Sequence, residues 1–312
     1  DSEDDIGYAL KVNTLNKLSL SGDKNPWKFK VGTGYEYVDK YFTPIERFRS
    51  VEFQRDWNIT NVQFSSDQHI VSGLTGFERK DDANFQYDFD LLKNIREFDG
   101  IRNSLTSFYK WKGFTLKGKA SLLTTEGVNN TEFLRYRALL SKTIGWLEIG
   151  VREEVERNKF FVAQNNDSLQ AGSFDFRIWR TYIRTADTTT NSFMLSYQQR
   201  ADNFPLGTGF KGTTLADDVT FQLNLLKNPN HRFRTKATYR RLEILVPTLT
   251  TQQPEENVLA RVEYVAKFLK RAISSNTFYE VGSGLEVRKE FSFVEVQAGQ
   301  GTHAYIGDAN GN

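Results

Sequence analysis

The sequence predicts an all-β protein in which long, mostly antiparallel strands form an extended sheet or a sandwich-like or barrel-like arrangement. Two observations carry this prediction. Apolar and polar residues alternate with a period of two through most of the chain, which is typical of strands that bury one face. Short turn-forming stretches separate these alternating runs, and strands joined by such turns pair in the antiparallel sense.

The alternation begins near the N-terminus and recurs through the first part of the chain. Residues 28–31 and 35–38 alternate, and residues 48–53 follow the same pattern. In residues 85–90, three aromatic residues alternate with one glutamine and two aspartates. Each of these runs is predicted to be a strand with one buried face.

The second half of the chain holds five clearer alternating runs. Their apolar positions are Leu147, Ile149, Val151 and Val155; Phe174, Phe176 and Ile178; Phe193, Leu195 and Tyr197; Val219, Phe221, Leu223 and Leu225; and Phe233, Ala237 and Tyr239. Turns are predicted at residues 166–168, 187–189 and 227–230 from their Asn, Asp, Pro and Thr content. The strands should be about ten residues long, which exceeds the usual five or six.

Three segments have a less regular pattern. Residues 257–273 fit an amphipathic helix and a strand equally well, and the neighbouring strands favour a strand. Residues 201–216 and 247–256 show no sustained period and are predicted to be long loops. Because no linker is evident, residues 1–312 are expected to form a single large β-rich region.

The composition excludes several classes of function. The chain has 41 basic and 39 acidic residues, so its near-neutral charge indicates no nucleic-acid partner. Cysteine is absent, which excludes disulfides, thiol catalysis and cysteine metal sites. No apolar run is long enough to predict a transmembrane helix.

The usual signatures of catalysis are also missing. The three histidines, His69, His231 and His303, are far apart and have no metal-ligand spacing. The glycine-rich residues 207–212 lack the order of a phosphate-binding loop, and no nucleophile elbow is present. Paired carboxylates are so frequent that cross-strand ion pairing explains them. The sequence therefore predicts a protein that is not an enzyme and has no cofactor.

The C-terminal stretch ends in an incomplete pattern. Asp308, Asn310 and Asn312 place oxygen ligands on alternate residues, as at the start of a calcium-binding loop. The glycine and distal glutamate that complete such a loop do not follow, so we expect the chain to be a fragment of a longer protein. The alternative is a polar turn or a frayed terminus without a metal. The sequence therefore leaves two interpretations of these three residues open, an incomplete calcium loop and a terminus that binds no metal.

Three stretches together carry a family resemblance. They are residues 35–58, residues 275–286, and residues 293–302 with 308–312. They resemble the large exported β-rich proteins of Bacteroidota outer membranes, and within that group the plug proteins of the type 9 secretion translocon. The resemblance implies a non-enzymatic subunit that closes the periplasmic opening of a large outer-membrane translocon barrel. It also implies a periplasmic location, peripheral to the outer membrane, and it carries over no catalytic residue.

Three functional hypotheses follow. The first is this plug, a stiff sheet whose exposed aromatic residues, Trp111 and Trp179, anchor it to its protein partner. The second is an integral outer-membrane β-barrel, whose strands would be long enough to span. Thr235 and Glu153 interrupt the apolar faces, and paired aromatic girdles are not evident in the linear sequence, so this hypothesis ranks second. The third is an extracellular enzyme or a carbohydrate-binding sandwich, which no catalytic constellation supports.

Overall fold

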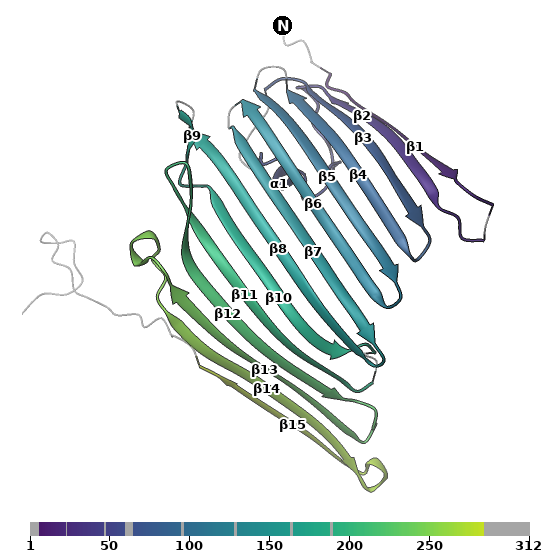
Figure 1. Ribbon diagram of the computed structural model, residues 1–312, viewed down its shortest axis with the longest axis vertical. Helices are drawn as coiled ribbons and strands as arrows, with labels where there is room; N and C mark the ends of the chain where they lie inside the picture. The colour runs from purple at the N-terminus through teal and green to yellow at the C-terminus, as the bar shows by residue number, and fades with distance from the viewer. Residues whose placement is uncertain are drawn as a thin grey trace, which may run out of the picture.

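The computed structural model describes residues 6–22, 24–46, 48–59, 65–94, 97–127, 130–162, 165–187 and 190–283. These residues form one antiparallel sheet of 15 strands (Figure 1). The strands are β1 (Ala9–Ser19), β2 (Lys28–Val38), β3 (Gln68–Arg79), β4 (Ala83–Asn94), β5 (Phe98–Trp111), β6 (Phe114–Gly127), β7 (Thr131–Ile144), β8 (Leu147–Val162), β9 (Asn165–Leu169), β10 (Phe174–Thr185), β11 (Ser192–Leu206), β12 (Gly209–Leu225), β13 (His231–Ile244), β14 (Glu255–Phe268) and β15 (Ile273–Gly282). Three short helical elements complete the fold: α1 (Phe53–Asp56), η1 (Pro247–Leu249) and η2 (Leu269–Arg271).

The strands follow one another across the sheet in chain order, so every pairing joins strands that are neighbours in sequence, except the pairing of β8 with β10. The short strand β9 pairs only with β8, and β10 takes the next place in the sheet. The prediction of an all-β fold with long antiparallel strands is confirmed. Several strands are longer than predicted, and β12 reaches 17 residues. Within the described residues β1 and β15 do not pair with each other, so the sheet is open.

Two of the ambiguous segments can now be assigned. Residues 257–273 are strand over most of their length, since β14 covers Glu255–Phe268, so the favoured interpretation is confirmed. The long loop predicted at residues 201–216 is wrong, because β11 and β12 continue through it and pair. The register of that pair shifts between Asp202 and Asn203. A β-bulge inserts an extra residue and breaks the period of two, which explains why the alternation was not visible there.

The two edges formed by the strand ends differ in character. The hairpin edge carries the turns that follow β1, β3, β5, β7, β10, β12 and β14, and the loop edge carries the other connections (Figure 1). At the hairpin edge, Lys112 and Gly113 alone connect β5 to β6 and have φ angles of 43° and 80°. Positive φ at both positions is the geometry of a type I′ turn, whose twist matches that of the flanking strands.

The longest connection, between β2 and β3 on the loop edge, folds back over one face of the sheet and contains α1. Trp57 and Ile59, which follow α1, pack against one apolar side chain from each of five neighbouring strands. These five are Ile70, Leu92, Phe98, Leu123 and Phe133. Gly100 leaves the space that this packing needs, because a Cβ there would lie 3.2 Å from the Trp57 ring and 2.7 Å from the Phe98 ring.

Candidate functional site

The register divides the side chains of the sheet between two faces, which are defined here on β4. Gln86, Asp88 and Asp90 point to the face that carries α1, which we call the polar face. Phe85, Tyr87 and Phe89 point to the opposite, outer face. Because directly paired residues share a face, the hydrogen-bonded register extends this division to every other strand.

The outer face is predominantly apolar, and no segment of the described chain forms a layer over it. Along it, large apolar side chains from almost every strand each expose 36 % or more of their surface. Among the described residues they include Val31, Val71, Phe77, Tyr87, Phe89, Ile101, Leu105, Leu116, Leu122, Leu140, Ile149, Val151, Leu195, Val219, Phe221, Leu225, Tyr239, Val258 and Tyr264. An exposed apolar surface of this extent indicates contact with a membrane or with a partner protein.

Aromatic residues line the outer face at the hairpin edge. Ring pairs form along this edge: Phe29 with Phe77, Phe85 with Tyr109, Trp111 with Phe114, and His231 with Tyr264 and Phe268 join neighbouring strands, and Trp146 in the β7–β8 turn pairs with Phe193 on β11. We call these residues the aromatic row. The row was not visible in the linear sequence, because its members come from eight strands and one turn and are aligned only by the register.

Toward the loop edge, strands β8 to β12 carry polar residues on the outer face. Arg177 contacts Glu153 at 2.5 Å, so the acidic interruption noted in the sequence is neutralised by a partner. Trp179 Nε1 donates a hydrogen bond to Gln199 Oε1 at 3.1 Å, and the Tyr197 hydroxyl donates to Asp217 at 2.5 Å. The outer face therefore changes from apolar to polar along these strands, from the hairpin edge to the loop edge.

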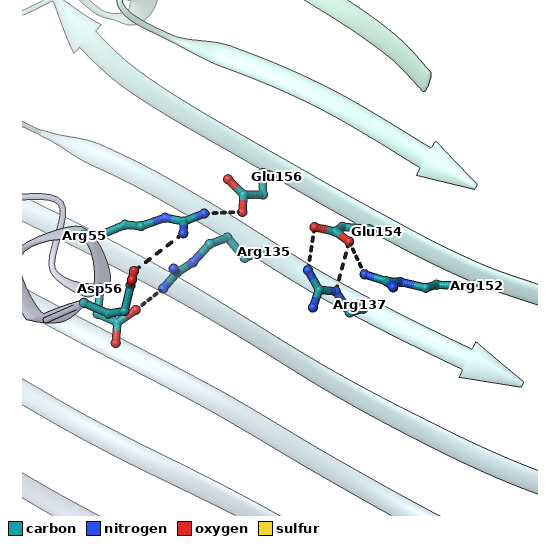
Figure 2. A network of polar contacts seen from close by, with 8 residues as sticks. Arg55, Asp56, Arg135, Arg137, Arg152, Glu154 and Glu156 are labelled. Atoms are coloured by element: carbon teal, nitrogen blue, oxygen red, sulfur yellow. Dashed lines mark hydrogen bonds and ion pairs between the residues drawn. The ribbon is translucent and has the colours of Figure 1, made fainter. Parts of the chain in front are cut away.

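On the polar face, ion pairs fix α1 to strands on either side of it. Asp56 accepts from Arg135 at 2.7 Å, and Arg55 contacts Glu156 at 2.5 Å (Figure 2). Asp56 also accepts from Arg102 at 3.1 Å. These contacts connect α1 to β5, β7 and β8. The side chains are only 15–53 % exposed, so screening by solvent is partial.

Further contacts hold the two ends of the same segment. Arg49 donates to Glu36 on β2 at 2.8 Å. Asn58 exchanges two hydrogen bonds of 3.0 Å with Asn158 on β8. Because these partners lie on β2 and β8, which are the two ends of a run of seven consecutive strands, the segment lies across the polar face rather than along one strand.

A second network on the polar face centres on Glu154. Its carboxylate accepts hydrogen bonds from Arg137 at 2.8 and 2.9 Å and from Arg152 at 2.8 Å (Figure 2). Between this network and α1 lies an open concavity of about 740 Å³, which Lys119 also lines. Its charged lining can bind polar or ionic groups, but no nucleophile–base pair that would indicate catalysis is evident among its lining residues.

The two tryptophans predicted as anchors lie on the outer face but at different depths. Trp111 is 53 % exposed and stacks on Phe114 at a ring-centroid distance of 6.5 Å, so it belongs to the aromatic row. Trp179 is half-buried on β10, among the polar side chains of the outer face. The structure places them on strands β5 and β10 and does not bring them together. Their role in binding a partner remains a prediction.

Asp308, Asn310 and Asn312, the residues of the predicted calcium loop, lie outside the described residues. The same holds for the third stretch that carries the family resemblance. Within the part of the chain that is described, no group of three or more His, Cys, Asp or Glu side chains could hold a metal ion. Across the same residues, no helix is both long and apolar enough to cross a membrane.

No protein-family model matches this chain, and no curated protein or solved structure matches it either. The geometry itself defines a structural class. It is an antiparallel β-sheet with one exposed apolar face, one charged face, and a helical segment held on the charged face by ion pairs.

Proposed function

We propose that the chain forms part of the wall of an integral membrane β-barrel, with the outer face toward lipid and the polar face toward an aqueous lumen. The observation that carries this proposal is the division of apolar and charged side chains between the two faces. In transmembrane barrels the strands alternate between an apolar, lipid-facing side and a polar interior. A water-soluble sheet would instead bury its apolar side against a second layer.

The strand lengths support the same proposal. A tilted β-strand needs about 9–11 residues to cross the hydrocarbon core of a bilayer. Strands β4 to β8 have 12 to 16 residues, and strands β10 to β14 have 12 to 17. Each of these strands is long enough to span the bilayer and extend beyond it.

The aromatic row and the polar residues of the outer face on β8 to β12 indicate how the sheet would be placed in the membrane. Transmembrane barrels have aromatic residues where the hydrocarbon meets the headgroups. The aromatic row at the hairpin edge would mark one such boundary. The charges of Glu153, about midway along β8, and of Arg177, within β10, form an ion pair, and charged residues inside a membrane commonly pair with one another.

A pair of arginine substitutions on neighbouring residues of β5 tests which face meets lipid. Leu105 is 50 % exposed on the outer face, and Ser104 lies beside it on the polar face. Leu105→Arg should reduce insertion into vesicles, because an arginine at the bilayer midplane costs about 2–4 kcal/mol. Ser104→Arg should insert like the wild-type chain. Insertion is measured as the protease-protected, vesicle-bound fraction after refolding, and equal insertion of both variants would contradict the assignment of the faces.

The pore-closing role implied by the family resemblance is the second proposal. A plug inside a translocon would bury the same outer face against protein, and Trp111 would then be one anchor of that contact. Such a subunit would leave the membrane on a carbonate wash and would be recovered with a large barrel protein. The aromatic row favours lipid contact over this alternative.

A further inference from the structure

The register places like charges directly opposite each other at four positions on the polar face. The pairs are Lys17 with Lys30, Lys119 with Arg137, Arg152 with Arg180, and Lys236 with Arg261. All four pairs are basic, and no two acidic residues of the described strands face each other on this side. Directly opposed like charges destabilise a sheet. Glu78 contacts both Lys17 and Lys30, and Glu280 lies directly opposite Arg261, so carboxylates offset the two outer pairs. The repulsion that a bound anion would relieve is therefore greatest at the two central pairs.

The two central pairs lie on adjacent strands and form one cluster, which we call the basic cluster: Lys119, Arg137, Arg152 and Arg180. Their strands β6, β7, β8 and β10 are consecutive in the sheet. The one carboxylate hydrogen-bonded within the cluster is Glu154, which Arg137 and Arg152 share. Glu156 also attracts Arg137 electrostatically, so the four positive charges face two carboxylates and the excess is two positive charges.

Two members of the basic cluster keep unused capacity for an anion. Arg180 donates to the neutral side chain of Gln198, at 2.5 and 3.0 Å, and forms no ion pair with a described residue. Lys119 likewise forms no ion pair with a described residue. It lies in the open concavity of about 740 Å³ beside α1, whose lining includes six carboxylates and five basic side chains. Arg and Lys side chains of this kind bind oxyanions through charge-assisted hydrogen bonds.

We propose that the basic cluster is a binding site for oxyanions on the polar face. The ligand class is a carboxylate-, sulfate- or phosphate-bearing solute that approaches from the aqueous side of the sheet. This inference rests on the proposed function, because it names the solute class that the lumen of such a barrel would attract. The anion site lies on the polar face, whereas the membrane proposal depends on the outer face.

The test is calorimetric titration of the detergent-solubilised chain with inorganic pyrophosphate at low salt. The wild-type chain should bind the probe, and the affinity should fall as salt rises, because screening weakens charge–charge attraction. The double variant Lys119→Gln with Arg180→Gln removes both unpaired cations and should weaken binding by tenfold or more. A wild-type chain that fails to bind pyrophosphate would overturn the proposal.

A matched control removes two positive charges from the outer face, with Lys93→Gln and Lys142→Gln. This control should bind pyrophosphate like the wild-type chain, and equal weakening in both double variants would overturn the site by showing only a net-charge effect. Pyrophosphate should also raise the melting temperature of the wild-type chain and leave that of the Lys119/Arg180 variant unchanged. If the chain binds pyrophosphate but does not enter vesicles, the anion site is retained and the membrane proposal is rejected. If the chain enters vesicles but does not bind pyrophosphate, the membrane proposal is retained and the anion site is rejected.

Discussion

At the scale of single residues, Asp56 connects the helical segment to the sheet. Its carboxylate contacts Arg102 and Arg135, which come from β5 and β7, and Arg102 also contacts Asp90 on β4 at 2.8 Å. One side chain on a four-residue helix therefore joins three strands. Removing one member of a partly buried ion network leaves its partners without compensation, which costs more than the pair itself contributes.

Asp56→Asn should loosen the helical segment without unfolding the sheet. The loss of charge-assisted hydrogen bonds is expected to cost about 1–3 kcal/mol, which corresponds to roughly 5–150-fold faster local opening. Hydrogen exchange of the amides in residues 53–59 measures this opening. Glu52→Gln is the matched control, because the Glu52 side chain is 60 % exposed and, among the described residues, its carboxylate forms an ion pair with Arg55 alone, at 3.5 Å. Unchanged exchange in the Asp56 variant would show that the apolar contacts of Trp57 alone hold the segment.

At the scale of elements, the strands could be predicted from the sequence, but the face of the sheet on which their apolar residues lie could be predicted only for some strands. The alternation in β8 and β12 correctly grouped the outward apolar residues. In β10 the apolar positions Phe174, Phe176 and Ile178 lie on the polar face, since they pair with Asn158, Glu156 and Glu154. A local period assigns residues to two faces, but only the pairing with neighbouring strands shows which face is which.

The candidate sites depended even more on contacts between distant parts of the chain. The pairs of Asp56 with Arg135 and of Arg55 with Glu156 join residues 79 and 101 positions apart. No short motif could have indicated them. The aromatic row also depended on the observed turns, because the turn between Trp111 and Phe114 was not among those predicted from the sequence.

The aromatic row leads to a prediction about depth in the membrane. Trp111 should lie at the lipid interface, whereas Trp57 is only 2 % exposed on the polar face. Lipids brominated near the headgroup should therefore quench part of the tryptophan fluorescence of the inserted chain. Trp111→Phe should reduce the quenched fraction, and Trp57→Phe should leave the amount quenched unchanged. An identical effect of the two substitutions would argue against placing the row at the interface.

At the scale of the whole molecule, the sheet is a continuous amphipathic surface rather than a closed core. The main buried cluster of the described residues, around Leu92 and Leu123, lies under the helical segment on the polar face. The outer face gains no comparable burial from the described chain, although burying a large apolar side chain contributes about 1.5–3 kcal/mol. Lipid acyl chains would supply that burial across the whole outer face and would account for the arrangement of both faces.

The most direct test of the membrane proposal is flotation of the chain, refolded with phospholipid vesicles, on a density gradient after a carbonate wash. A sheet whose outer face contacts acyl chains should float with the vesicles after the wash and leave them only in detergent. Recovery of the washed protein at the bottom of the gradient, folded and free of lipid, would contradict the account and would favour a sheet that covers its apolar face with a protein partner.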